Sequence, residues 1–263
     1  MSKLSIIIPA YNEEKRIEKT LISYSEFLRE KVKNKELAGF EIIVVLNNCS
    51  DNTLGITKKI KDKFIEIKIL DFERGGKGFA IMEGFKDSLK RDSDLIGFVD
   101  ADMATSPQSF FDLVKNIRNY DGIIASRALK QSRANFSLKR KITHKGFNFV
   151  VRSFFLFRFR DTQCGAKLFK RIVLQKITPE LSLTEWAFDV NLLYLCKKRK
   201  YKVKEFPTIW QDKEESKLNL IKAPLQMFSG VLRLRLIFSP FENILGPLKF
   251  LQKIWFNLFH KQI

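Results

Sequence analysis

The feature that most constrains the fold is a repeated alternation of apolar, β-branched runs with helical patterns in the N-terminal part of the chain. The apolar runs cover residues 4–8, 40–46, 65–70 and 95–99. Continuous apolar runs are typical of parallel strands buried on both faces, and helices between such strands are typical of a doubly wound sheet. The sequence therefore predicts an α/β fold, with a Rossmann-like, mainly parallel sheet flanked by helices.

Polar residues stand where each predicted strand ends. They are Tyr11, Asn47, Gly76 and Asp100. In sheets of this kind, ligands bind beyond the carboxyl ends of the strands, so we expect these positions to converge on one crevice. Asn12 is expected to cap a first helix that runs to about residue 31.

The triplet Asp100-Ala101-Asp102 carries the clearest chemistry. Two carboxylates one residue apart follow the fourth predicted strand. Mg²⁺ and Mn²⁺ bind through one or two carboxylates together with phosphate oxygens. Alone, such a triplet is more often a strand-end cap, but its position in the α/β pattern favours a metal site at Asp100 and Asp102.

Gly76-Lys77-Gly78 is a second candidate for phosphate binding. Glycine lets backbone approach a ligand closely, and lysine can meet a phosphate. The spacing matches neither a Walker A loop nor a dinucleotide fingerprint. A glycine-rich turn before a helix is an equally good reading of these residues alone.

The chain is strongly basic, with a formal net charge of +19. Residues 127–171 hold 13 Lys or Arg and a single acid, Asp161, interleaved with phenylalanines. Cations mixed with large apolar side chains suit an anionic membrane surface. The three cysteines form no CxxC pair, and the sequence contains no apolar run long enough to be a transmembrane helix. Nucleic-acid binding is the weaker alternative, because no RNA- or DNA-binding module is recognisable.

These residues together resemble family 2 glycosyltransferases with a GT-A fold. The first half of the resemblance rests on residues 6–13, the turn to Asp51, Gly76-Lys77-Gly78 and Asp100-Ala101-Asp102. The later segments are similar to dolichyl-phosphate β-glucosyltransferases, namely residues 161–169, residues 185–190, and Trp210 with Ser216-Lys217-Leu218. The resemblance covers about residues 3–220.

The resemblance implies inverting transfer of a sugar, glucose from UDP-glucose, to a polyprenyl or dolichyl phosphate with Mg²⁺ or Mn²⁺ as cofactor. A phosphate monoester is already ionised near neutral pH, so a strong general base is less needed than for a hydroxyl acceptor. Another donor such as GDP-mannose, or a non-lipid hydroxyl acceptor, stays open; a hydroxyl acceptor would give the role of base to Asp189 or Glu185.

Site residues follow from matching positions in the resemblance. The expected donor-binding residues are Pro9, Tyr11, Glu13, Asn47, Gly76, Lys77, Asp100, Ala101 and Asp102. The expected acceptor-phosphate residues are Arg127, Arg140 and Lys217, since arginine meets phosphate with two parallel hydrogen bonds. The expected catalytic residues are Asp102, Arg127 and Asp189, of which Asp189 is a base or an orienting group.

The organisation expected from these patterns is a catalytic domain over residues 1–220 and a basic, aromatic, amphipathic extension over residues 221–263. The extension holds Arg233 and Arg235 and is broken by prolines. We expect a peripheral or monotopic protein on the cytoplasmic face of a membrane, with a nucleotide-sugar, a polyprenyl phosphate and an anionic membrane surface as partners and no nucleic acid.

Overall fold

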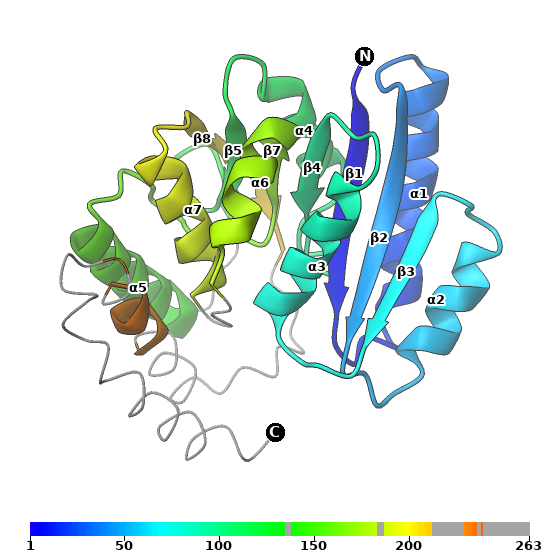
Figure 1. Ribbon diagram of the computed structural model, residues 1–263, viewed down its shortest axis with the longest axis horizontal. Coiled ribbons are helices and arrows are strands. Elements are labelled where there is room, and N and C mark those ends of the chain that lie inside the picture. The colour runs from blue at the N-terminus through cyan, green and yellow to red at the C-terminus, as the bar shows by residue number, and fades with distance from the viewer. Residues whose placement is uncertain (135–137, 183–186, 212–228, 236–237, 239–263) are drawn as a thin grey trace.

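A computed structural model describes residues 1–134, 138–182, 187–211, 229–235 and 238, and it confirms the predicted α/β fold (Figure 1). The main-sheet strands are β1 (Lys3–Ala10), β2 (Gly39–Asn47), β3 (Ile67–Phe72), β4 (Leu95–Phe98), β5 (Gly122–Ser126), β7 (Lys167–Lys170) and β8 (Val203–Pro207). Their order is β3-β2-β1-β4-β7-β5-β8. The short strands β6 (Arg133–Ala134) and β9 (Ile209–Trp210) form a separate parallel pair.

Helices cover both faces of this sheet (Figure 1). They are α1 (Ile17–Lys33), α2 (Thr53–Lys61), α3 (Lys77–Leu89), α4 (Pro107–Asn116), α5 (Leu138–Phe155), α6 (Arg171–Ile177) and α7 (Phe188–Lys198), with a 3-10 turn η1 (Thr178–Glu180). Alternate residues of β1 enter two cores. Ile6 and Ile8 pack with α1 and α4, whereas Ile7 packs with α3 and α7. Burial on both faces explains why the strands read as continuous apolar runs.

The strand β7 was not predicted from the sequence. It runs antiparallel between β4 and β5, so the sheet is mixed, whereas β3, β2, β1 and β4 are parallel to one another. The strand has four residues, and its first, Lys167, is a fully buried cation. A short strand with lysine at both ends does not show the apolar pattern from which buried strands are predicted.

The prediction that Asn12 caps the first helix is wrong. α1 begins at Ile17, after a turn in which the N–H groups of Arg16 and Ile17 both donate to the carbonyl of Glu13, at 2.9 Å each. Asn12 adopts a left-handed φ of 53°, and its side-chain oxygen accepts from the backbone N–H of Ser50 at 2.8 Å. The short side chain of Asn tolerates this conformation, so Asn12 joins two loops instead of starting a helix.

Part of the predicted C-terminal extension packs on the α/β core. Val231 and Leu234 are buried in the core that contains α3, α6 and α7, while Arg233 and Arg235 are exposed. The remaining extension, residues 221–228, 236–237 and 239–263, lies outside the described residues. Among the described residues, no helix is both long enough and apolar enough to cross a membrane.

Candidate active site

Side chains and backbone join the loops that follow β1, β2 and β3, as expected for a crevice at the carboxyl end of the sheet. The amide of Asn47 donates to the carbonyl of Ala10 at 2.8 Å, and its oxygen accepts from the N–H of Gly76 at 3.1 Å. Asn47 is 3% exposed. Its visible role is therefore to hold the loops together, and donor binding by its side chain stays a prediction.

The loop after β4 is joined to the start of α3 by an ion pair. The ammonium of Lys77 lies 2.5 Å from one carboxylate oxygen of Asp100. Desolvation lowers the pKa of Lys77, but the charges of Asp100 and Asp189 outweigh it and raise the pKa above its ordinary value. Lys77 therefore stays cationic. It is the first residue of α3, directly after Gly76, whose φ is 122°. A cation and exposed N–H groups at a helix start suit a diphosphate.

The second carboxylate of the triplet, Asp102, lies in the same loop and is partly buried. Its oxygen accepts from the N–H of Ala104 at 2.9 Å, and the residue between them, Met103, has a left-handed φ of 60°. Burial raises the pKa of Asp102, and the charge of Asp100 raises it further. Two carboxylates that repel one another in this way favour a divalent cation between them and the donor.

Two side chains of α1 hold the backbone of this loop. The hydroxyl of Thr20 donates to the carbonyl of Ala101 at 2.6 Å, and the hydroxyl of Tyr24 donates to the carbonyl of Thr105 at 2.9 Å. Both side chains are fully buried. Sequence reasoning missed them, because they look like ordinary residues of an amphipathic helix.

Gly165 lies directly against Asp100. A Cβ atom at Gly165 would overlap the carboxylate of Asp100. Glycine is needed here because the segment before β7 approaches a candidate metal ligand closely. The sequence marked this segment only as part of a resemblance and gave Gly165 no role.

Asp189 joins the same cluster of charges through Lys167. The Lys167 ammonium lies 2.6 Å from the carboxylate of Asp189 and donates to the carbonyl of Cys164 at 2.7 Å. Asp189 is half-buried in the first turn of α7, and its charge also raises the pKa of Lys77. Asp100, Lys77, Asp189 and Lys167 therefore form one alternating set of charges.

Arg127 follows β5 and pairs with the one acid of the basic segment. Its guanidinium meets the carboxylate of Asp161 through two bonds, at 2.7 Å and 3.0 Å, and its backbone N–H donates to the same carboxylate at 3.0 Å. The guanidinium also lies over the ring of Trp210, at 5.2 Å from its centroid. Desolvation lowers the pKa of Arg127, but Asp161 outweighs this and raises it.

The remaining predicted site residues that the structure describes do not belong to these charged contacts. Glu13 is bound to Arg16 through two hydrogen bonds at 2.7 Å and 2.8 Å, and burial, its largest influence, raises the pKa of Glu13. Tyr11 is 46% exposed beside it, whereas Pro9 is buried at the end of β1. The side chain of Arg140, in α5, and all of Lys217 lie outside the described residues.

The Arg127–Asp161 pair gives a prediction about stability. Replacing Asp161 by asparagine removes the carboxylate that meets the largely buried Arg127 guanidinium at 2.7 Å and 3.0 Å, which costs roughly 3 kcal/mol of unfolding free energy. Urea unfolding measures the loss. The control is Asp92→Asn, because the Asp92 side chain is fully exposed and its nearest cation, Lys3, is 3.9 Å away. An Asp161→Asn protein as stable as the control would contradict the structural role.

The described residues fit a metal that takes some of its ligands from the protein and the others from a bound substrate. Asp100 and Asp102 offer carboxylate oxygens from one loop, and no group of three or more His, Cys, Asp or Glu able to hold a metal occurs in the described part of the chain. Divalent ions of the Mg²⁺ type accept one or two carboxylates if phosphates and water complete the shell. The donor set thus fits a metal–diphosphate complex.

Known proteins resemble this chain in sequence and in fold. The model of the family described as "Glycosyl transferase family 2" matches residues 5–178. A dolichyl-phosphate β-glucosyltransferase of Drosophila melanogaster is 36% identical over 239 residues, which are 86% of this chain and 72% of the relative. The enzyme of the same name from Dictyostelium discoideum is 34% identical over 254 residues, 92% of this chain and 75% of the relative.

A solved structure confirms the architecture. Glucosyl-3-phosphoglycerate synthase from Mycobacterium tuberculosis, in complex with Mn²⁺, UDP and glucosyl-3-phosphoglycerate, has a TM-score of 0.66 to this chain at 16% identity. The likeness covers 91% of this chain and 82% of that one. At this level of identity, the comparison establishes a shared GT-A fold.

Proposed function

Because the chain belongs to glycosyl transferase family 2, and is therefore a glycosyltransferase, we propose that it moves a sugar from a nucleotide diphosphate to the phosphate of a polyprenyl lipid. We propose UDP-glucose as the donor and inversion at the anomeric carbon as the outcome. The names of the Drosophila and Dictyostelium relatives support the glucose and the dolichyl phosphate, and the Mycobacterium complex supports UDP.

The single observation that carries this proposal is the alternating set of charges at the carboxyl end of the sheet. Lys77 contacts Asp100 at 2.5 Å, and Lys167 contacts Asp189 at 2.6 Å. A leaving diphosphate needs positive charge beside it in the transition state. Lys77 supplies fixed charge at the start of α3, and the Asp100 and Asp102 carboxylates would hold Mg²⁺ or Mn²⁺. When bound, the metal supplies further charge neutralisation at the diphosphate.

A phosphate acceptor also accounts for how Asp189 is placed. An ionised phosphate attacks without first losing a proton, so the site needs no strong base. Asp189 is paired with a buried lysine, which fixes its position. We assign Asp189 to orienting the sugar and Lys167, and we assign Arg127, close to Cys164 and Asp161, to the acceptor phosphate.

The location that fits this function is the cytoplasmic face of a membrane, where a lipid phosphate meets a soluble nucleotide-sugar. The proposal divides the chain into a catalytic domain, residues 1–220, and an extension, residues 221–263, that contacts the bilayer. Exposed Arg233 and Arg235 beside the 41% exposed Leu232 support this role for the described part of the extension.

A donor panel tests the proposal. The purified protein is incubated with polyprenyl phosphate, Mg²⁺ or Mn²⁺, and UDP-glucose, UDP-galactose or GDP-mannose, and the sugar is followed into the lipid phase. We expect glucose to enter the lipid phase at least tenfold faster than the other sugars, and chelation of the metal to stop transfer. Transfer only to a soluble hydroxyl acceptor would contradict the proposal and would make Asp189 the candidate base.

A further inference from the structure

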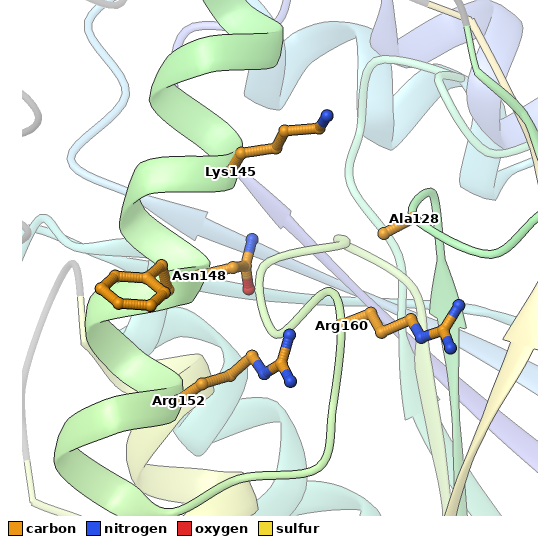
Figure 2. A pocket seen from close by; sticks show the side chains of 6 residues that line it. Ala128, Lys145, Asn148, Arg152 and Arg160 are labelled. Carbon is orange, nitrogen blue, oxygen red and sulfur yellow. The ribbon is translucent and has the colours of Figure 1, made fainter.

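A basic pocket lies between α5 and the loops on either side of the Arg127–Asp161 pair. Its volume is about 570 Å³, and it is lined by Ala128, Lys145, Asn148, Phe149, Arg152 and Arg160. Lys145, Asn148 and Arg152 extend from one side of α5 toward the loop that carries Arg160 (Figure 2). Their spacing of three and four residues places them on one face of the helix.

The three cations of this pocket have no anionic side-chain partner within the part of the chain that the structure describes. Across the described residues, no carboxylate forms an ion pair or a side-chain hydrogen bond with Lys145, Arg152 or Arg160; the bond of Arg160 to Glu205 comes from its backbone N–H. Like charges gathered around one hollow repel one another. An anion in the pocket relieves this repulsion, which indicates a ligand that carries phosphate or a similar charge.

The same helix presents apolar side chains beside the cations. Phe149 is 72% exposed and Leu156, directly after the helix, is 76% exposed. Lys145, Phe149 and Arg152 follow the helical spacing i, i+4 and i+7, so a ring lies between two cations along α5. Leu156 follows the end of the helix, where its φ is 51°. This pattern matches a lipid interface, where rings enter the headgroup layer and cations meet phosphates.

The neighbouring, buried side of α5 fixes the helix to the protein, and Asn148 lies at the border between this side and the pocket. Val151 and Phe155 are buried with α7, and Asn148 is 4% exposed. The oxygen of Asn148 accepts from the N–H and the hydroxyl of Thr162 at 3.0 Å and 3.1 Å. Thr162 follows Asp161, so the floor of the pocket is one residue from the carboxylate that holds Arg127. A ligand in this pocket would therefore lie beside the edge of the candidate active site.

We propose that this pocket binds the phosphate headgroup of an anionic phospholipid in the bilayer, at a site separate from the phosphate that receives the sugar. Lys145, Arg152 and Arg160 meet the phosphate, while Phe149 and Leu156 enter the headgroup layer. A nucleic acid offers phosphate too, but it gives no place for the exposed aromatic side chain of Phe149 and the exposed aliphatic side chain of Leu156. Binding at this site would keep the part of the protein around Arg127 close to the membrane surface.

The test removes the three charges together. Lys145→Gln, Arg152→Gln and Arg160→Gln are combined, and co-sedimentation measures binding to vesicles of phosphatidylcholine with and without phosphatidylglycerol. Three cations at an anionic surface contribute on the order of a hundredfold in affinity, so we expect that loss on the anionic vesicles. The matched control is Lys58→Gln, Lys59→Gln and Lys61→Gln in the last turn of α2, at the far end of the sheet (Figure 1), with an expected loss below about threefold.

Two further readouts separate this site from others. The rate and KM with a short, water-soluble polyprenyl phosphate should stay within about twofold of the unchanged protein, because the reacting phosphate binds elsewhere. A KM that rises with the vesicle dissociation constant would assign the pocket to the acceptor and overturn the proposal. Equal losses of vesicle affinity in both triple variants would also overturn it. Oligonucleotide binding is measured in parallel, and a loss of that binding with vesicle binding intact would overturn the proposal too. If no sugar reaches any polyprenyl phosphate, the proposed function fails while the vesicle result still decides this site.

Discussion

Asp102→Asn is expected to lower the rate of sugar transfer by on the order of a hundredfold to a thousandfold. A bound metal lowers the barrier by several kcal/mol through charge at the leaving diphosphate. Asparagine keeps the size of the side chain and can still accept from the N–H of Ala104, but it removes the charge that attracts the cation. The rate should recover only in part when the metal concentration is raised.

A binding measurement makes this prediction independent of turnover. A ligand that binds only the folded protein raises the melting temperature, so Mn²⁺ with UDP should raise it for the unchanged protein. Asp102→Asn should abolish most of that metal-dependent rise. The control is Asp62→Asn, an exposed acid at the end of α2, which should behave like the unchanged protein. A normal rate, or an intact metal-dependent rise, in Asp102→Asn would refute the metal assignment.

The first four strands could be predicted from their apolar runs, and β1, β2 and β4 owe these runs to burial on both faces. Ile6 and Ile8 pack into one core and Ile7 packs into the other, so successive positions in the middle of β1 must be apolar. Such a run is visible in a sequence. The polar loops that follow are equally visible, and Asp100 and Lys77 do come together as the pattern predicts.

The parts that could not be predicted depend on pairing between distant residues. Lys167 reads as a surface lysine, yet it is fully buried and meets Asp189, which is 22 positions away. Its burial is tolerable only because Asp189 and the carbonyl of Cys164 surround the ammonium. Periodicity carries no information about such a partner, and for the same reason it did not indicate the antiparallel strand that begins at Lys167.

Asn12 was wrongly predicted to cap a helix, whereas Lys167 and β7 were missed. Asn before a helical pattern is a good cap by local rules, but the loop after β2 offers the N–H of Ser50 to the same side-chain oxygen. The contact between the two loops is stronger than the local preference because it also orders the turn that contains Glu13. Local sequence rules fail here at a candidate binding site, where loops from different strands meet.

Gly165→Ala is expected to reduce transfer by roughly a hundredfold with little change in stability. The added methyl group would overlap the carboxylate of Asp100. This carboxylate is the end of a rotatable side chain, so it turns away and the backbone keeps its place. Rotation breaks the 2.5 Å contact with Lys77 and moves a metal ligand. A misplacement of about 1 Å at a reacting centre can cost about a hundredfold in rate.

Gly146→Ala is the matched control for this substitution. Gly146 lies in α5, where a Cβ atom would meet nothing within 4 Å. Because alanine favours a helix more than glycine does, this variant should transfer sugar normally and melt at an equal or higher temperature. Equal rates in the two variants would show that the contact between Gly165 and Asp100 has no role in transfer.

A double-mutant cycle identifies the route by which Gly165→Ala acts. Asp100→Ala removes the carboxylate, whose atoms are the three nearest to a methyl group at position 165. If the whole effect passes through Asp100, Gly165→Ala should change the rate of the Asp100→Ala protein by less than about threefold, which is strong non-additivity. Two losses that multiply would mean that the alanine disturbs β7 and the Lys167–Asp189 pair beyond it. The cycle therefore decides between two roles for Gly165: leaving space for the Asp100 side chain, or meeting a structural requirement of the antiparallel strand.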